Sequence, residues 1–190
     1  MALADSQMLE LGTRAPEFSL PDAEGNIYSL RDDASAYVVM FICNRCPFVK
    51  HIREELARLG DDCLSKNVAV YGINSNDATR YPGDSPAMML REIETYGYRF
   101  PYLIDEDQSI AKAYRAACTP DIYLFNGAKK LVYRGQLDDS RPSNNLPVDG
   151  SDLRTAIDAV LSNSNIEPQQ KPSIGCSIKW QEGNAPDYFG

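Results

Sequence analysis

Two cysteines separated by two residues stand where an apolar segment meets a predicted helix. Cys43 and Cys46 enclose Asn44 and Arg45, and the apolar run 37–42 precedes them. A thiol at the N-terminus of a helix meets backbone N–H groups without partners and the positive end of the helix dipole, and both favour the thiolate. The thiolate is the form that attacks disulfides. The pattern therefore predicts a redox-active dithiol.

The spacing predicts different roles for the two thiols. With Cys43 at the mouth of the helix and Cys46 one turn further in, the sulfurs can form a disulfide with little backbone movement. We expect Cys43 to face solvent and attack, and Cys46 to resolve the mixed disulfide. Pro47 follows with a φ angle suited to a first helical turn. Arg45 lies between the thiols, and its positive charge is expected to lower the pKa of Cys43 modestly.

The elements that would hold this dithiol form a parallel crossover unit. The apolar run 37–42 predicts a buried strand, and residues 47–59 carry an apolar stripe at helical spacing. A second apolar strand is predicted over 68–74. Two strands that are apolar almost throughout and are joined by a helix are typical of a parallel pair.

The remaining pattern completes an α/β sandwich, with a mixed central sheet flanked by helices. Turn residues around 22–25 separate two short extended runs and predict an N-terminal β-hairpin. Asn126 and Gly127 separate two apolar runs and predict a second hairpin. The expected elements are hairpin strands at 17–20, 26–30, 122–125 and 130–133, a short strand at 102–104, and helices at 87–97, 108–117 and 151–161.

The chain is expected to be one domain with an extension. Residues 1–162 would form the domain, since a core of this size can bury about 70% of its unfolded surface. Residues 163–190 are rich in proline and amide side chains and show neither helical nor strand periodicity, which predicts an extended C-terminal tail. The tail holds Cys176 and the single tryptophan, Trp180. Its apolar content predicts that it docks on the domain.

Charge and composition argue against several partners. The formal net charge of -8 would repel nucleic acid and anionic membrane surfaces. No segment approaches the roughly 18 consecutive apolar residues of a membrane span, and the first residues lack the pattern of a signal peptide. We therefore expect a cytoplasmic protein without nucleic-acid or membrane partners. Five cysteines, an odd number, do not suggest a secreted disulfide framework.

A metal site is the structural alternative to a redox dithiol. A closed zinc site needs four ligands, and the sequence offers no second pair of cysteines at this spacing and one histidine, His51. We therefore expect no metal. Cys63 follows the predicted helix and is expected to be a small buried hydrophobic side chain.

The arrangement of these motifs resembles the thioredoxin fold. Thr119 and Pro120 follow the dithiol by about seventy residues and lead into the strand 122–125 and the second hairpin. The resemblance implies that Pro120 is cis and lies beside the dithiol, and that the backbone of Thr119 binds an incoming peptide or thiol substrate. Cys118 would then lie near the dithiol, where packing is its expected role. Cys176 is either an anchor in the docked tail or a third redox cysteine.

The resemblance is closest to one branch of that fold. Residues 12–22 look like the opening of the peroxiredoxin and TlpA/ResA-like proteins of the alkyl hydroperoxide reductase/thiol-specific antioxidant superfamily. Together with Cys43 and Cys46, the segments 138–142 and 172–180 are similar to peroxiredoxin-like proteins of the thioredoxin fold. The resemblance spans nearly the whole chain.

The chain also departs from both patterns. Peroxiredoxins carry a proline and a threonine upstream of the reactive cysteine, and here Ala36 and Met40 occupy those positions. Neither side chain can orient a peroxide oxygen. Thioredoxin has a tryptophan before its first cysteine and an acidic residue upstream, where this chain has Ile42 and Tyr37. Deprotonation of Cys46 must then use water or another group.

These observations predict a thiol-disulfide oxidoreductase that cycles Cys43 and Cys46 between dithiol and disulfide. Its substrate would be a protein or small-molecule disulfide, an external thiol would reduce it again, and no bound cofactor is needed. One alternative is a peroxide reductase with antioxidant activity, in which Cys43 becomes a sulfenic acid that Cys46 or Cys176 resolves. The other is a non-catalytic module that holds extended peptides beside Pro120.

Overall fold

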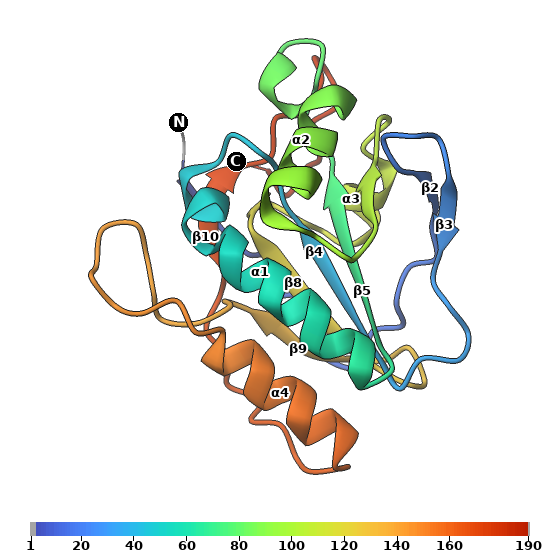
Figure 1. Ribbon diagram of the computed structural model, residues 1–190, viewed down its shortest axis with the longest axis vertical. Helices are drawn as coiled ribbons and strands as arrows, with labels where there is room; N and C mark the ends of the chain where they lie inside the picture. Colours follow the sequence, from blue (N-terminus) through green and yellow to red (C-terminus); the bar gives the residue numbers. More distant parts are fainter. Residues whose placement is uncertain (1–2, 190) are drawn as a thin grey trace.

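The computed structural model describes residues 3–189, and at its centre lies a mixed sheet of five strands. β4 (Ala36–Phe41) occupies the middle, with β5 (Val68–Asn74) parallel to it on one side and β8 (Asp121–Asn126) antiparallel on the other. β6 (Tyr102–Ile104) extends the sheet beyond β5, and β9 (Leu131–Gly135) extends it beyond β8 (Figure 1). The predicted mixed sheet and its parallel crossover are confirmed.

Every residue of β4 is buried, which explains why its sequence is apolar rather than alternating. Successive side chains of a strand point to opposite faces, so each face of the sheet needs its own apolar set. Val38 and Met40 face one cluster of buried side chains, whereas Tyr37, Val39 and Phe41 face the other. The sheet is therefore the middle layer of a three-layer sandwich.

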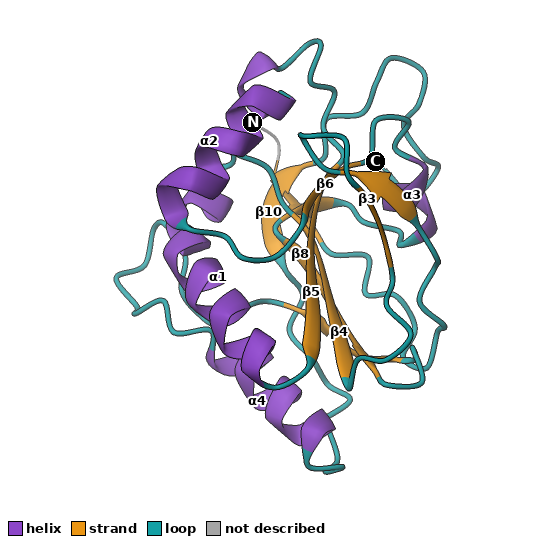
Figure 2. Cartoon of the chain, turned by 45° about the vertical axis from the view of Figure 1, so that its right-hand side comes forward, coloured by secondary structure: helices purple, strands orange, loops and turns teal. Residues whose placement is uncertain are grey.

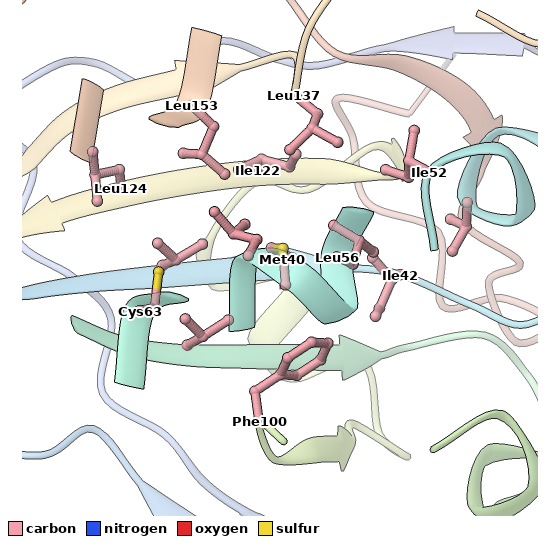
Figure 3. Packing of buried hydrophobic residues seen from close by; sticks show 14 of the residues in the cluster. Met40, Ile42, Ile52, Leu56, Cys63, Phe100, Ile122, Leu124, Leu137 and Leu153 are labelled. Carbon is pink, nitrogen blue, oxygen red and sulfur yellow. The ribbon is translucent and has the colours of Figure 1, made fainter. Parts of the chain in front are cut away.

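Three helices cover the face that carries Val38 and Met40. They are α1 (Pro47–Ser65), α2 (Pro86–Tyr96) and α4 (Ser151–Leu161), and Figure 2 shows them along one side of the sheet. Leu56 of α1 and Leu153 of α4 are fully buried and lie among the apolar side chains of β4 and β8 (Figure 3).

The other face is covered by shorter elements. β2 (Ser19–Pro21) and β3 (Ile27–Ser29) form a hairpin, which confirms the predicted N-terminal hairpin. The hairpin lies on this side of the sheet together with α3 (Ser109–Ala113). Ile178 and Trp180 of the C-terminal tail also pack into this layer. Between residues 3 and 189, no helix has the length and apolar character needed to cross a membrane.

Two helices differ from their predicted bounds. α1 continues six residues beyond 47–59, because Cys63 extends the stripe of buried side chains by one more turn. α3 covers only five residues of the predicted helix 108–117, and Arg115 beyond it has a left-handed backbone with φ 53°. The loop between β5 and α2 contains a single 3-10 turn, η1 (Pro82–Asp84).

The tail is the largest difference from the prediction. Although its sequence shows no strand periodicity, β10 (Ile174–Ser177) pairs antiparallel with β1 (Leu3–Asp5) on one side and β7 (Cys118–Thr119) on the other. Part of the segment expected to be an extended tail is thus the middle strand of a second sheet. A four-residue strand leaves too short a pattern to be recognised from sequence.

Candidate active site

The dithiol lies where β4 runs into α1, as predicted, and the helix begins at Pro47, the first residue of the expected helix 47–59. Cys46 is the residue that caps α1, which starts at Pro47, so Cys46 rather than Cys43 stands at the helix mouth. Cys43 is 3% exposed and Cys46 is 1% exposed. The expectation that Cys43 faces solvent is therefore wrong. Cys176 and Trp180 of the tail line the same pocket as the dithiol.

The predicted cis bond between Thr119 and Pro120 is confirmed, and Thr119 contacts both thiols. The Cys43 Sγ lies 3.3 Å from the Thr119 Oγ1. The Cys46 thiol donates to the backbone carbonyl of Thr119 at 3.0 Å. The cis-proline strand and the dithiol, 73 residues apart at their nearest, therefore form one site.

Cys46 is the more acidic of the two thiols. Its sulfur accepts a hydrogen bond from the Cys43 thiol, and the Cys176 thiol and the N–H of Val49 add to this. Burial opposes ionisation. The carbonyl of Thr119 opposes it too, because it can bind only the protonated thiol, whereas the hydroxyl of Thr119 favours the thiolate. The donors outweigh these opposing effects and lower the pKa of Cys46 to about 5.

The pKa of Cys43 moves in the opposite direction, contrary to the sequence-based expectation. Its proton is held in the hydrogen bond to Cys46, burial disfavours its charged form, and the carboxylate of Asp84 repels it, so the pKa lies well above the ordinary value. The hydroxyl of Thr119 opposes this rise as a donor. The first proton to leave the pair therefore comes from Cys46.

Asp84 of η1 holds the loop between the two cysteines. Its Oδ1 accepts the backbone N–H of Asn44 at 2.9 Å and that of Arg45 at 3.2 Å. Its Oδ2 accepts the Asn76 amide at 2.9 Å. Asn44 is fixed further by the hydroxyl of Tyr102, which donates to its Oδ1 at 2.9 Å. The N–H groups that could stabilise a Cys43 thiolate are thus already bound to a carboxylate.

The Arg45 side chain, which lies between the two cysteines in the sequence, packs against η1 and Tyr81. Its guanidinium lies 5.0 Å from the centre of the Tyr81 ring, a cation–π distance. Its aliphatic stem passes over Gly83, where a Cβ would lie 2.6 Å from the Arg45 Cδ. Arg45 therefore helps to attach η1 to the loop between the cysteines, and its effect on Cys43 remains a prediction.

The other cysteines and the histidine occupy distinct environments. The Cys118 thiol donates to the carbonyl of Pro120 at 3.4 Å, and burial raises its pKa well above the ordinary value. Cys63 is buried near the end of α1, as expected. His51 is half-buried, and its Nε2 has no hydrogen-bond partner among the described residues.

An open pocket of about 540 Å³ borders the dithiol. Cys43, Cys46 and Cys176 line it together with Arg45 and Asp84. A reactive pair of thiols beside such a space can meet a disulfide on another molecule. The roles of Asp84, Asn76 and Tyr102 could not be predicted from the sequence, because each lies in a segment that shows only turn residues or a short strand.

Comparison with known proteins agrees with this architecture. Residues 11–134 match the family model described as AhpC/TSA family. A crystal structure of an uncharacterized conserved protein from Geobacillus kaustophilus is 54% identical, covers 95% of this chain and 97% of its own, and superposes with a TM-score of 0.91. A hypothetical protein from Sinorhizobium meliloti 1021 is 51% identical over 94% of this chain and 99% of its own, with a TM-score of 0.92.

A characterised relative is more distant. The thiol-disulfide oxidoreductase ResA of Halalkalibacterium halodurans is 24% identical over 131 residues, which is 68% of this chain and 70% of that protein. The predicted thioredoxin-like fold is confirmed by the solved structures. The matched family region covers most of the chain and contains both cysteines of the dithiol together with Thr119 and Pro120. The chain belongs to the AhpC/TSA family.

Proposed function

We propose that this protein is a thiol-disulfide oxidoreductase whose reactive groups are Cys43 and Cys46. The observation that carries the proposal is that both thiols contact Thr119, next to the cis proline, at 3.3 Å and 3.0 Å, and that both line an open pocket. Two thiols in hydrogen-bond contact, one of them acidic, suit reversible disulfide formation. The distant relation to ResA supports the same chemistry.

In the proposed cycle the hydrogen bond between the thiols sets the order of events. Cys43 passes its proton to the Cys46 thiolate, and the resulting Cys43 thiolate attacks one sulfur of a substrate disulfide. The other substrate sulfur leaves as a thiolate, and a mixed disulfide forms. The substrate thiolate that has left takes up the proton that Cys46 received. The Cys46 thiolate then attacks the Cys43 sulfur, the second substrate sulfur leaves as a thiolate that takes a proton from solvent, and a disulfide joins the two cysteines. An external thiol reductant returns the pair to its dithiol form.

The assay is the reduction of insulin disulfides in the presence of dithiothreitol. Cys43→Ser should abolish the activity, and Cys46→Ser should accumulate a mixed disulfide that gel electrophoresis without reductant detects. Cys63→Ser is the matched control, because this buried cysteine lies in the core and away from the pocket. Activity that survives Cys43→Ser would reject the assignment.

A peroxide reductase is the second candidate, and one contact favours it. The Thr119 hydroxyl, 3.3 Å from the Cys43 sulfur, is a polar group beside the thiol of the kind that Ala36 and Met40 cannot supply. Both of those residues are fully buried in β4. Stopped-flow measurement of hydrogen peroxide consumption by the reduced protein separates the candidates, since a rate no faster than that of a simple thiol excludes this one.

The non-catalytic alternative, a module that holds extended peptides beside Pro120, has less support. The strand edge at Thr119 is already paired with Cys176 of the protein's own tail, so a peptide would have to displace β10 to bind there. A dithiol that titrates near the ordinary pKa of about 8.5, with equal reactivity at both cysteines, would favour this alternative over the oxidoreductase.

A further inference from the structure

The tail brings a third cysteine to the dithiol. In the pairing of β10 with β7, Cys176 lies opposite Thr119, the residue whose carbonyl accepts the Cys46 thiol. β10 contacts α1, and Figure 1 shows the strand beside the first turn of that helix. The Cys176 thiol is hydrogen-bonded to the Cys46 sulfur. Cys46 therefore has two thiol neighbours, Cys43 and Cys176.

The position of Cys176 depends on a close approach of two backbones. A Cβ on Gly175 would lie 2.0 Å from the carbonyl oxygen of Thr119 and 2.6 Å from its carbonyl carbon. Both atoms belong to the backbone and cannot move aside as a flexible side chain could. Only glycine at position 175 allows β10 to pack this tightly against the cis-proline strand.

Hydrogen bonds on the C-terminal side of Cys176 hold the tail in register. The N–H of Ile178 donates to the carbonyl of Ala117 at 3.1 Å. The N–H of Lys179 donates to the Asn76 Oδ1 at 2.8 Å, and its carbonyl accepts the Gln108 amide at 3.0 Å. Cys176 is therefore presented to Cys46 by an ordered strand and not by a loose chain end.

We propose that Cys176 is a third redox cysteine, which exchanges with the disulfide of the proposed catalytic pair. This inference rests on the proposed function. In the step, the Cys176 thiolate attacks the Sγ of Cys46, the bond between Cys43 and Cys46 breaks, and a bond between Cys46 and Cys176 forms. The electron pair leaves on the Cys43 sulfur, which takes up the proton that Cys176 lost. No net oxidation occurs, and Cys43 is again a thiol.

The charge on Cys46 controls when Cys176 can react. Burial and the hydrogen bond to Cys46 raise the pKa of Cys176 to about 12 in the reduced protein, while the charge of Lys179 opposes the rise. Formation of the first disulfide removes the negative charge on Cys46 and thus one cause of that rise. Cys176 therefore becomes a better nucleophile only after the catalytic pair has been oxidised.

The test maps disulfides in protein equilibrated with oxidised glutathione, blocked with iodoacetamide and digested for mass spectrometry. Cys43→Ser should contain the Cys46–Cys176 disulfide, and the double variant Cys43→Ser/Cys176→Ser should lose it. Cys43→Ser/Cys118→Ser is the matched control and should keep it, since the Cys118 thiol is bound to the carbonyl of Pro120. Gly175→Ala should reduce its yield, because the strand is pushed away from Thr119.

Wild-type protein provides the second measurement and distinguishes the two proposals. Partly oxidised wild type should contain the Cys43–Cys46 disulfide and, in a second population, the Cys46–Cys176 disulfide with Cys43 alkylated. The redox role of Cys176 is overturned if wild type forms only the Cys43–Cys46 disulfide and Cys43→Ser forms no Cys46–Cys176 disulfide. The proposed function stands in that case. If no disulfide joins Cys43 to Cys46, both are overturned. Far-ultraviolet circular dichroism of each variant establishes that the comparison is between folded proteins.

Discussion

The two ends of α1 each carry a buried cysteine, and the two thiols behave in opposite ways. Cys46 at the first turn is 1% exposed and its pKa falls to about 5, whereas Cys63 near the last turn is 2% exposed and its pKa rises to about 11. Burial is the largest cause at Cys63, and the charges of Lys66 and Arg154 do not compensate for it. At Cys46 the hydrogen-bond donors outweigh burial.

The comparison shows that depth alone does not decide whether a cysteine is reactive. A buried acid ionises easily when donors converge on it and resists ionisation when they do not. The donors at Cys46 come from Cys43, from the first turn of α1 and from β10, three parts of the chain that meet only in the folded protein.

The largest effect is expected at Asp121, a buried acid that resembles Cys63. Its Oδ1 has no hydrogen-bond partner in the part of the chain that is described, and burial raises its pKa from 3.8 to about 6. The native state therefore holds a proton that the unfolded chain releases between these values, so this group's contribution to stability falls as the pH rises through the window. Asp121→Asn removes the titration.

The quantity to measure is the free energy of unfolding of Asp121→Asn minus that of wild type, from urea denaturation at several pH values. Because about two pKa units correspond to about 3 kcal/mol, this difference should increase by about 3 kcal/mol between about pH 4 and about pH 7. Other titrating groups cancel in the subtraction. If this difference does not change with pH, the pKa of Asp121 is not raised. Its partners would then offset the effect of burial, as the donors do at Cys46.

The second-largest effect is expected when the main hydrogen-bond donor at Cys46 is removed. In Cys43→Ala the Cys46 thiolate loses the hydrogen bond that contributes most to its low pKa. Since a hydrogen bond to a charged group contributes about 1.5–3 kcal/mol, we expect the pKa of Cys46 to rise by about one to two units. Thiolate absorbance in the ultraviolet, followed against pH, measures this shift. Cys63→Ala should leave the step of Cys46 near pH 5 unchanged, and an unchanged step in Cys43→Ala would mean that other donors suffice.

The dithiol and its supporting strands could be predicted because their signals are local. The spacing of Cys43 and Cys46, the apolar run of β4 and the Thr119–Pro120 pair each lie within a few consecutive residues. The order of acidity of the two thiols could not be predicted. It depends on where a turn and a tail pack in three dimensions, and neither Asp84 nor Cys176 carries a local pattern that says which residue it will meet.

The helix bounds illustrate the same difference on a smaller scale. A helix expected over 47–59 extends to Ser65, because Cys63 finds a place in the core that α4 and the sheet provide together. Its start at Pro47 agrees with the expected bound and makes Cys46 the capping residue. Because the helix begins directly after Cys46, that thiol and not Cys43 stands at the helix mouth.

A third prediction concerns the negative charge beside Cys43. Asp84→Asn keeps an oxygen that can accept the N–H groups of Asn44 and Arg45 but removes the charge that repels a Cys43 thiolate. The second proton of the dithiol should therefore leave at a pH lower by about one unit, or about 1.4 kcal/mol. The titration of thiolate absorbance at alkaline pH measures it. Glu24→Gln, which removes an exposed charge from the distant hairpin, should have no effect.

The smallest effect is expected from the hydroxyl of Thr119. The Thr119 hydroxyl lies 3.3 Å from the Cys43 sulfur and, as a donor, lowers the pKa of that thiol. Thr119→Val removes this donor but keeps the shape of a β-branched side chain. A bond of this length to sulfur should contribute less than about 1 kcal/mol, so the second titration step of the dithiol should move up by less than about one unit. Thr119→Ser restores a hydroxyl and should reverse the shift. If valine and serine titrate alike, the hydroxyl does not act on Cys43, and the contact that favours a peroxide reductase loses its support.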